Sequence, residues 1–181
     1  FLGAGVVVCV SAMRGVLFAL VVALPASCSA ASGECVFGGD VGYSLLERNP
    51  SSQHGAAAHA AAWFGLTDLV WLQASGGAAQ MLARGDSEAR TVGEASVGLV
   101  LALDVFRAIP YLEASAGALF YAEDLDPYAR IGVGVDYFVT RSLSVGAVAR
   151  LRFVPRPLGD RWTTLAARVA YRFDEASLLV K

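Results

Sequence analysis

Histidine is the side chain of this sequence with the widest chemical repertoire, since an imidazole can transfer protons, activate a nucleophile or bind a metal. Neither His54 nor His59 begins an H-E-x-x-H pattern or another metal-ligand spacing. Ser51 and Ser52 share a predicted loop with His54, and no other serine lies at strand spacing from either histidine, as a Ser–His–acid arrangement would need. We expect a solvated His54 in a loop, an internal polar His59, and no catalytic residue, metal site or cofactor.

Acids and arginines at alternate positions form a second group of chemical interest, and they share their side of the chain with glycine and serine. The group has five carboxylates and five guanidinium groups: Asp40, Glu94, Asp104, Glu113, Asp136, Arg130, Arg150, Arg152, Arg168 and Arg172. Buried charges must be paired and hydrogen-bonded. We therefore predict that this set forms a charge network inside the fold, which either plugs the interior or lines a conductive path, and we favour the plug.

The elements that position these residues follow a two-residue period of apolar and polar side chains, which is typical of half-buried strands. In the segment RIGVGVDYF, Ile131 and Val133 alternate with Arg130 and Gly132. Composition alone would also allow a helix in the alanine-rich segment 55–64. The pattern predicts eight strands, over residues 35–46, 55–64, 69–79, 91–105, 111–121, 128–137, 143–153 and 162–173.

The connections between these strands alternate in length. Short turns are predicted at 65–68, 107–110 and 139–142, and longer polar loops at 47–54, 81–90, 122–127 and 154–161. Short turns at one end and longer loops at the other indicate an antiparallel up-and-down meander. Closing that meander into a barrel removes the exposed strand edges.

The composition indicates a hydrophobic protein surface and gives no sign of a nucleic-acid partner. Of the 181 residues, 56% are hydrophobic and 17% are charged, whereas about 25% are charged in ordinary soluble domains. The net charge is −2, and no basic stripe suggests a nucleic-acid partner.

Two barrel classes fit the alternation: a soluble lipocalin-like carrier with its apolar face inside, or a membrane barrel with that face outside. Glycines on the polar face favour the second, because they would give luminal arginines room. Aromatic residues near strand ends, with aliphatic residues between them, indicate interfacial girdles: Phe106, Tyr111, Tyr121, Tyr128, Tyr137, Phe138, Phe153, Trp162, Tyr171 and Phe173. We therefore expect Ile131, Val133 and Val135 to touch lipid.

The first 31 residues resemble a secretory signal. Met13 and Arg14 precede an apolar run and then small residues up to Ala31, which is the tripartite pattern of a signal peptide. We predict a signal peptide region at 1–31 with a true start at Met13, a barrel at 34–173 and a short C-terminal tail at 174–181. Cleavage would leave Cys35 as the one cysteine, so no internal disulfide is expected in the exported protein.

The segments YARIGVGVDYFVTRSLSVGAVARLRF and AARVAYRF resemble the late hairpin and the final strand of small outer-membrane β-barrel proteins of the OmpA and OmpW type. The resemblance covers roughly residues 34 to 173 and implies a bacterial outer membrane, periplasmic termini and external longer loops. The tail after Phe173 is a departure, as is the lack of a peptidoglycan-binding domain.

The sequence predicts an all-β protein, an eight-stranded antiparallel up-and-down transmembrane barrel with a structural or interaction role and no enzyme activity. We expect membrane lipid or lipopolysaccharide and the barrel assembly machinery as partners, and a monomer. The alternatives are a soluble lipocalin-like carrier of a small apolar ligand, a narrow passive channel and a lipid-A-modifying enzyme.

Overall fold

A computed structural model describes residues 34–48, 51–82, 89–103, 107–121, 124–155 and 161–174 of the chain. The predicted signal peptide region, Asp104, Phe106 and residues 175–181 of the tail lie outside these residues. Cys35 is disulfide-bonded in the 181-residue chain, and its partner cysteine lies outside the described residues. The absence of a disulfide after leader removal therefore stays a prediction.

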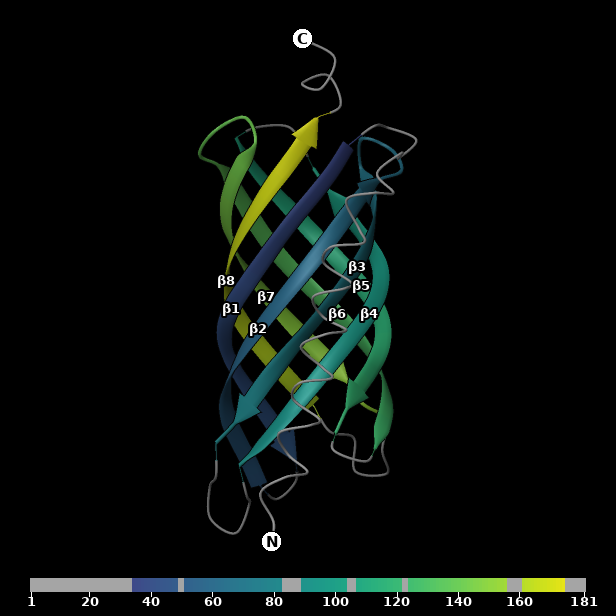
Figure 1. Ribbon diagram of the computed structural model, residues 1–181, viewed down its shortest axis with the longest axis vertical. Coiled ribbons are helices and arrows are strands. Elements are labelled where there is room, and N and C mark those ends of the chain that lie inside the picture. Colours follow the sequence, from purple (N-terminus) through teal and green to yellow (C-terminus); the bar gives the residue numbers. More distant parts are fainter. Residues whose placement is uncertain are drawn as a thin grey trace, which may run out of the picture.

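Eight antiparallel strands close into a barrel in sequence order (Figure 1). They are β1 (Glu34–Arg48), β2 (Ser51–Gly65), β3 (Val70–Met81), β4 (Arg90–Ala102), β5 (Ala108–Phe120), β6 (Leu125–Phe138), β7 (Leu143–Phe153) and β8 (Arg161–Asp174). The register of β1 against β8 runs from Glu34 opposite Asp174 to Glu47 opposite Arg161, so the barrel has no free edge. The predicted fold class is confirmed.

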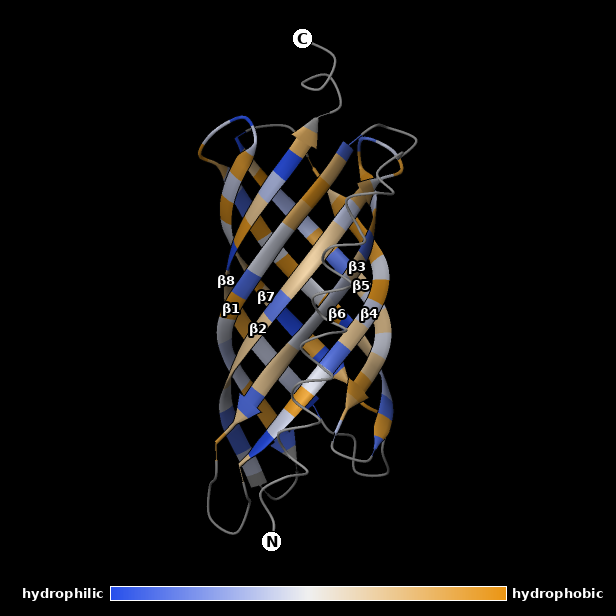
Figure 2. Cartoon of the chain, viewed as in Figure 1, coloured by the Kyte–Doolittle hydropathy of each residue, from blue (hydrophilic) through white to orange (hydrophobic). Residues whose placement is uncertain are grey.

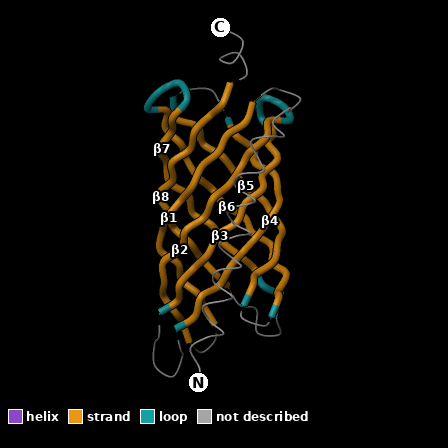
Figure 3. The backbone as a smooth tube through the Cα atoms, viewed as in Figure 1, coloured by secondary structure: helices purple, strands orange, loops and turns teal. Residues whose placement is uncertain are grey.

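Two four-residue turns at the barrel end where β1 begins and β8 ends are built alike (Figure 3). Between β2 and β3, the amide of Thr67 donates to the carbonyl of Val70, and the Thr67 hydroxyl oxygen accepts from the amide of Val70. Between β6 and β7, Thr140 makes the same two bonds with Leu143. A hydroxyl that hydrogen-bonds nearby amides stabilises a tight turn locally. The second turn has the predicted bounds, and the first is shifted by one residue because Gly65 belongs to β2.

The connection between β1 and β2 is shorter than predicted. The sequence analysis placed a loop over 47–54, but β1 continues to Arg48 and β2 begins at Ser51. His54 therefore lies in a strand and not in a loop, and its ring contacts Tyr43 on β1. The apolar alternation stops earlier than the backbone ladder, because polar side chains replace apolar ones at the barrel rim. The turn predicted at 107–110 is also displaced, since β4 ends at Ala102 and β5 begins at Ala108.

Hydrophobic and hydrophilic residues alternate along the strands (Figure 2), and exposed and buried side chains alternate with them. Val133 on β6 and Leu101 on β4 point outward, with exposed fractions of 56% and 53%, while Arg130 and Glu94 on the same strands are buried. A soluble carrier would bury its apolar face instead. The outward orientation of the aliphatic face is therefore confirmed.

Among the described residues, no helix is long and apolar enough to cross a membrane.

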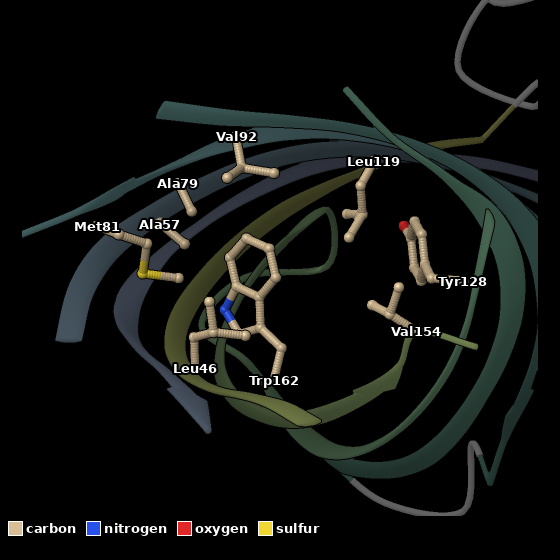
Figure 4. Packing of buried hydrophobic residues seen from close by; sticks show 9 residues of the cluster. All are labelled: Leu46, Ala57, Ala79, Met81, Val92, Leu119, Tyr128, Val154 and Trp162. Carbon is tan, nitrogen blue, oxygen red and sulfur yellow. The ribbon is translucent and has the colours of Figure 1, made fainter. Parts of the chain in front are cut away.

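Apolar side chains fill the two ends of the lumen. One group lies toward the end with the β1–β2 and β3–β4 connections, where its side chains point inward (Figure 4): Leu46, Ala57, Ala79, Met81, Val92, Leu119, Tyr128, Val154 and Trp162. The second lies toward the opposite end, which we call the terminal end because β1 starts and β8 stops there: Trp63, Trp71, Val100, Tyr111, Val148, Ala166 and Ala170. The central charged residues, among them Glu94, Glu113 and Arg150, lie between these two layers.

The aromatic girdles predicted from the sequence are partly wrong. Tyr137, Phe153, Tyr171 and Phe173 are exposed on the barrel surface as expected. Other aromatic residues of the predicted girdles point into the lumen: Tyr111, Tyr128, Phe138 and Trp162. Their parity along the strands explains the difference, because each lies an even number of residues from a luminal charge on its own strand.

Candidate functional site: the luminal charge network

Arg150 on β7 joins two carboxylates from different strands. Its Nε donates to Oε1 of Glu113 on β5 at 2.6 Å, and one terminal nitrogen donates to Oδ1 of Asp40 on β1 at 2.7 Å. All three residues are buried. One guanidinium with five donors can satisfy two carboxylates in this way, so Arg150 ties β5 and β1 together across the lumen.

Glu94 on β4 is the second centre of the network. Arg130 on β6 donates to Oε1 of Glu94 at 3.1 Å, and Arg152 on β7 reaches the same oxygen at 3.1 Å and Oε2 at 2.8 Å. The Nε of Arg130 also lies 3.5 Å from Oε1 of Glu113. Arg130 therefore connects the two carboxylate centres.

His59 lies within this network, as the sequence analysis expected. Its Nδ1 is 2.8 Å from Oδ1 of Asp40, and its Nε2 is 2.9 Å from a terminal nitrogen of Arg152. The same Nε2 lies 3.2 Å from Oε1 of Glu94, so the ring contacts two carboxylates and one guanidinium. His59 is thus a buried link between the two carboxylate centres of the network.

Hydroxyl groups complete the network, and the sequence analysis did not name them among the site residues. Ser75 accepts from Arg130 at 3.0 Å and shares a 2.8 Å hydrogen bond with Ser96. Thr164 accepts from Arg152 at 2.7 Å and contacts Ser44 at 2.9 Å. Their position on the polar face of the strands would have predicted that these hydroxyl groups lie in the lumen. Which arginine each hydroxyl meets depends on the barrel register.

Glycine separates acid from arginine in two parallel rows of the barrel wall. Gly132 on β6 lies opposite Glu113 on one side and Arg150 on the other. A Cβ at position 132 would lie 2.7 Å from Cγ of Glu113, so a larger residue would push the carboxylate away from its partner. The second row places Gly146 between Asp136 and Arg168 in the same manner. The predicted role of luminal glycines as space for long side chains is seen in both rows.

Asp136 and Arg168 form a separate pair nearer the terminal end, with 3.2 Å between carboxylate oxygen and guanidinium nitrogen. The guanidinium of Arg168 also lies 4.0 Å from the ring centroid of Trp63 and 4.7 Å from that of Tyr111. Arg172 lies outside the central network, with its guanidinium 4.8 Å from the ring centroid of Phe138. Nine of the ten predicted network residues are thus described, and the tenth, Asp104, lies outside the described residues.

The arrangement favours mutual neutralisation of charge over chemistry on a substrate. Three acids and three arginines surround His59 in the centre of the barrel, and all seven side chains are buried: Asp40, Glu94, Glu113, Arg130, Arg150 and Arg152, with His59. Among the described residues, no group of three or more His, Cys, Asp or Glu side chains is placed to hold a metal ion.

No protein-family model matches this sequence, and no curated protein matches it at significant similarity. The fold itself is similar to several solved structures. Neisserial surface protein A superimposes with a TM-score of 0.63 at 14% identity, over 77% of this chain and 97% of that chain. OprG of Pseudomonas aeruginosa gives 0.58 at 7% identity, over 78% and 96%. Ail of Yersinia pestis, in complex with the heparin analogue sucrose octasulfate, gives 0.53 at 12% identity, over 77% and 98%. The chain therefore has the fold of the small eight-stranded outer-membrane barrels.

Proposed function

We propose that this protein is an integral barrel of a bacterial outer membrane whose lumen is plugged, and whose role is structural or interactive. The observation that carries the proposal is the sorting of side chains across the barrel wall. Aliphatic residues such as Val133 cover the outside, and the buried Arg150 pairs with Glu113 and Asp40 inside. In a bilayer, a closed barrel satisfies all backbone groups and shows apolar side chains to lipid.

The soluble carrier alternative requires the opposite sorting. Its ligand would need an apolar lumen, but the middle of this lumen is ionic. Extraction of membranes separates the two classes. An integral barrel stays with the membrane through alkaline washing and needs detergent to dissolve, and its unboiled form migrates differently from its boiled form on a denaturing gel. Recovery in the aqueous wash as a monomer would contradict the proposal.

The plug is supported by the distances within the network, which leave the central side chains in contact with one another. We expect no discrete conductance steps from the purified protein in planar bilayers. A matched variant, Glu113→Ala with Arg150→Ala, removes one acid and one arginine and keeps the charge balanced. We expect conductance steps to appear in this variant. Steps in the unmodified protein would support the narrow passive channel instead and would overturn the plug.

A non-catalytic role is part of the proposal. A lipid-A-modifying enzyme would need its catalytic groups at the lipid-facing outer rim, whereas His59 lies in the lumen and His54 contacts Tyr43. Incubation with lipopolysaccharide should leave the acyl chains unchanged by mass spectrometry. If the protein released or transferred an acyl chain, and the His54→Ala variant did not, the proposed non-catalytic role would be overturned.

The partners that we propose follow from membrane residence. Outer-membrane lipid and lipopolysaccharide would surround the apolar belt, the barrel assembly machinery would insert the chain, and the protein would act as a monomer. Crosslinking in native membranes tests insertion by the assembly machinery and the monomeric state. We expect a transient crosslink to the assembly machinery and no stable crosslink between two copies of the chain. A persistent dimer would contradict the monomer.

A further inference from the structure

A cavity opens at the terminal end of the lumen, away from the central network. Its volume is about 60 Å³. A water molecule needs about 10–15 Å³ of such space, so the cavity has room for a molecule with about four or five non-hydrogen atoms. Phe138 and Arg172 on its lining are partly exposed, which places its mouth at this end of the barrel.

The lining carries both hydrogen-bond donors and hydrogen-bond acceptors. The donors are the indole Nε1 of Trp63 and, on Arg168, Nε and one terminal nitrogen. The acceptors are Oδ1 of Asp136 and the hydroxyl oxygen of Tyr111. All four side chains are more than nine-tenths buried, and these atoms have no hydrogen-bond partner among the described residues. Buried polar groups without partners are costly, so the lining favours a ligand that both donates and accepts hydrogen bonds.

The charges of the lining favour a ligand without net charge. Asp136 and Arg168 are paired at 3.2 Å, so their charges already compensate each other. Arg172 has a further interaction within the chain, and its guanidinium lies 4.8 Å from the ring centroid of Phe138. An anion or a cation would therefore bring an uncompensated charge into a mostly apolar enclosure, which is unfavourable.

A small amide combines neutrality with the required hydrogen-bonding groups. Its carbonyl oxygen has two lone pairs and its NH₂ group has two donors, which match the two donor residues and the two acceptor residues of the lining. An alcohol has a single donor and a ketone has none, so each would leave more of the lining unpaired. Apolar residues of the lining, among them Val36, Val100 and Ile109, suit a short hydrocarbon group on the amide.

We propose that this cavity is a binding site for small neutral amides. Arg168 and Trp63 donate to the carbonyl oxygen of the ligand, and Asp136 and Tyr111 accept from its NH₂ group. The described lining includes none of the arginines of the central network, so the site is independent of whether the barrel is plugged.

Four small molecules of nearly the same shape test the proposal. Acetamide donates and accepts hydrogen bonds, acetone only accepts, acetate accepts and is an anion, and acetamidinium donates and is a cation. Each is titrated against the refolded barrel in detergent micelles, with saturation-transfer NMR of the methyl signal as the readout and empty micelles as the blank. We expect saturable acetamide binding in the millimolar range, and binding of the other three molecules about fivefold weaker or less. Binding of any of these three as tight as that of acetamide would overturn the proposal.

Two variants of the lining locate the bound amide. Trp63→Phe removes the indole donor and keeps an aromatic ring, so it should weaken acetamide binding about twofold to tenfold, the effect of one hydrogen bond between neutral groups. Ala102→Leu fills the cavity and should abolish binding, whereas Ala147→Leu on the outer surface should bind as the unmodified protein does.

A difference in migration between boiled and unboiled samples on a denaturing gel verifies that each variant is folded. The two leucine variants decide the matter if Trp63→Phe does not fold. Absence of saturable acetamide binding to the unmodified protein, or equal binding by the two leucine variants, would overturn the proposal.

Discussion

Arg150 and Glu113 face each other across a strand that belongs to neither of them. Arg150 is on β7, Glu113 is on β5, and their 2.6 Å contact passes over Gly132 of β6. The pair therefore depends on three consecutive strands, on the correct register of each, and on the lack of a side chain in the middle one.

Loss of the Glu113 charge should be strongly destabilising. Glu113→Gln leaves the buried Arg150 with one carboxylate in place of two and removes a charge near Arg130. Breaking a buried ion pair on one side costs about 3–5 kcal/mol. We expect a loss of that size in the free energy of unfolding, measured by urea titration in lipid vesicles. Asp136→Asn breaks one 3.2 Å contact and should cost less.

The double variant Glu113→Gln with Arg150→Met is the control for this first prediction. Its destabilisation should be smaller than the sum of the two single losses, because the charges no longer stand alone. Strict additivity would show that the two residues do not interact.

Gly132→Ala should disturb the same pair without removing a charge. Its Cβ would lie 2.7 Å from Cγ of Glu113 and 2.8 Å from Oε1, so the carboxylate must move. Overpacking of this kind costs about 1–3 kcal/mol. Gly76→Ala on the barrel surface is the matched control, since its Cβ would meet one backbone oxygen at an ordinary 3.5 Å. Equal unfolding midpoints for the two alanine variants would contradict the proposed role of Gly132.

Val133→Arg tests the lipid-facing side of the wall. Val133 lies in the middle part of β6 and is 56% exposed on the outside. An arginine facing lipid near the bilayer midplane costs about 2–4 kcal/mol, and we expect this loss in vesicle-based unfolding. Val133→Leu should leave stability nearly unchanged. An unchanged midpoint for the arginine variant would mean that this face does not meet hydrocarbon.

His59→Leu should destabilise the barrel more than His54→Leu. His59 hydrogen-bonds Asp40 and Arg152 within the lumen, whereas His54 is partly exposed near the barrel rim. Leaving buried partners unsatisfied costs about 1–3 kcal/mol. The loss should be smaller than for Glu113→Gln, because Arg150 still neutralises Asp40. Equal losses in the two leucine variants would place His59 outside the network.

The strands and their faces were predictable because a period of two residues is a local property of the chain. It assigned Val133 and Leu101 to the outside and Glu113 and Arg150 to the inside before any contact was known. The same parity also placed Trp162 in the lumen, but its position near a strand end suggested an interfacial girdle instead. Local composition alone cannot separate an aromatic residue of the girdle from one that caps the lumen.

The pairing within the network was not predictable, because it depends on the stagger between strands. Asp40 and Arg150 are 110 positions apart in the sequence and meet through the closed barrel. The β1–β2 hairpin was misjudged near His54 for a related reason. Backbone pairing continues where the apolar period has ended, and the side chains carry no signal of it.

The two glycine rows have a consequence for assembly of the barrel. Four acid–arginine contacts of the centre join strands that are not neighbours and cannot form within a single hairpin, whereas the contact between Arg130 and Glu113 joins the adjacent strands β5 and β6. In a sheet that has entered the bilayer without closing, these acids and arginines would lack their ion-pair partners. Membrane insertion and barrel closure are therefore expected to be coupled. An inserted sheet that has not closed should have a higher free energy than the closed barrel and than the unfolded chain in water.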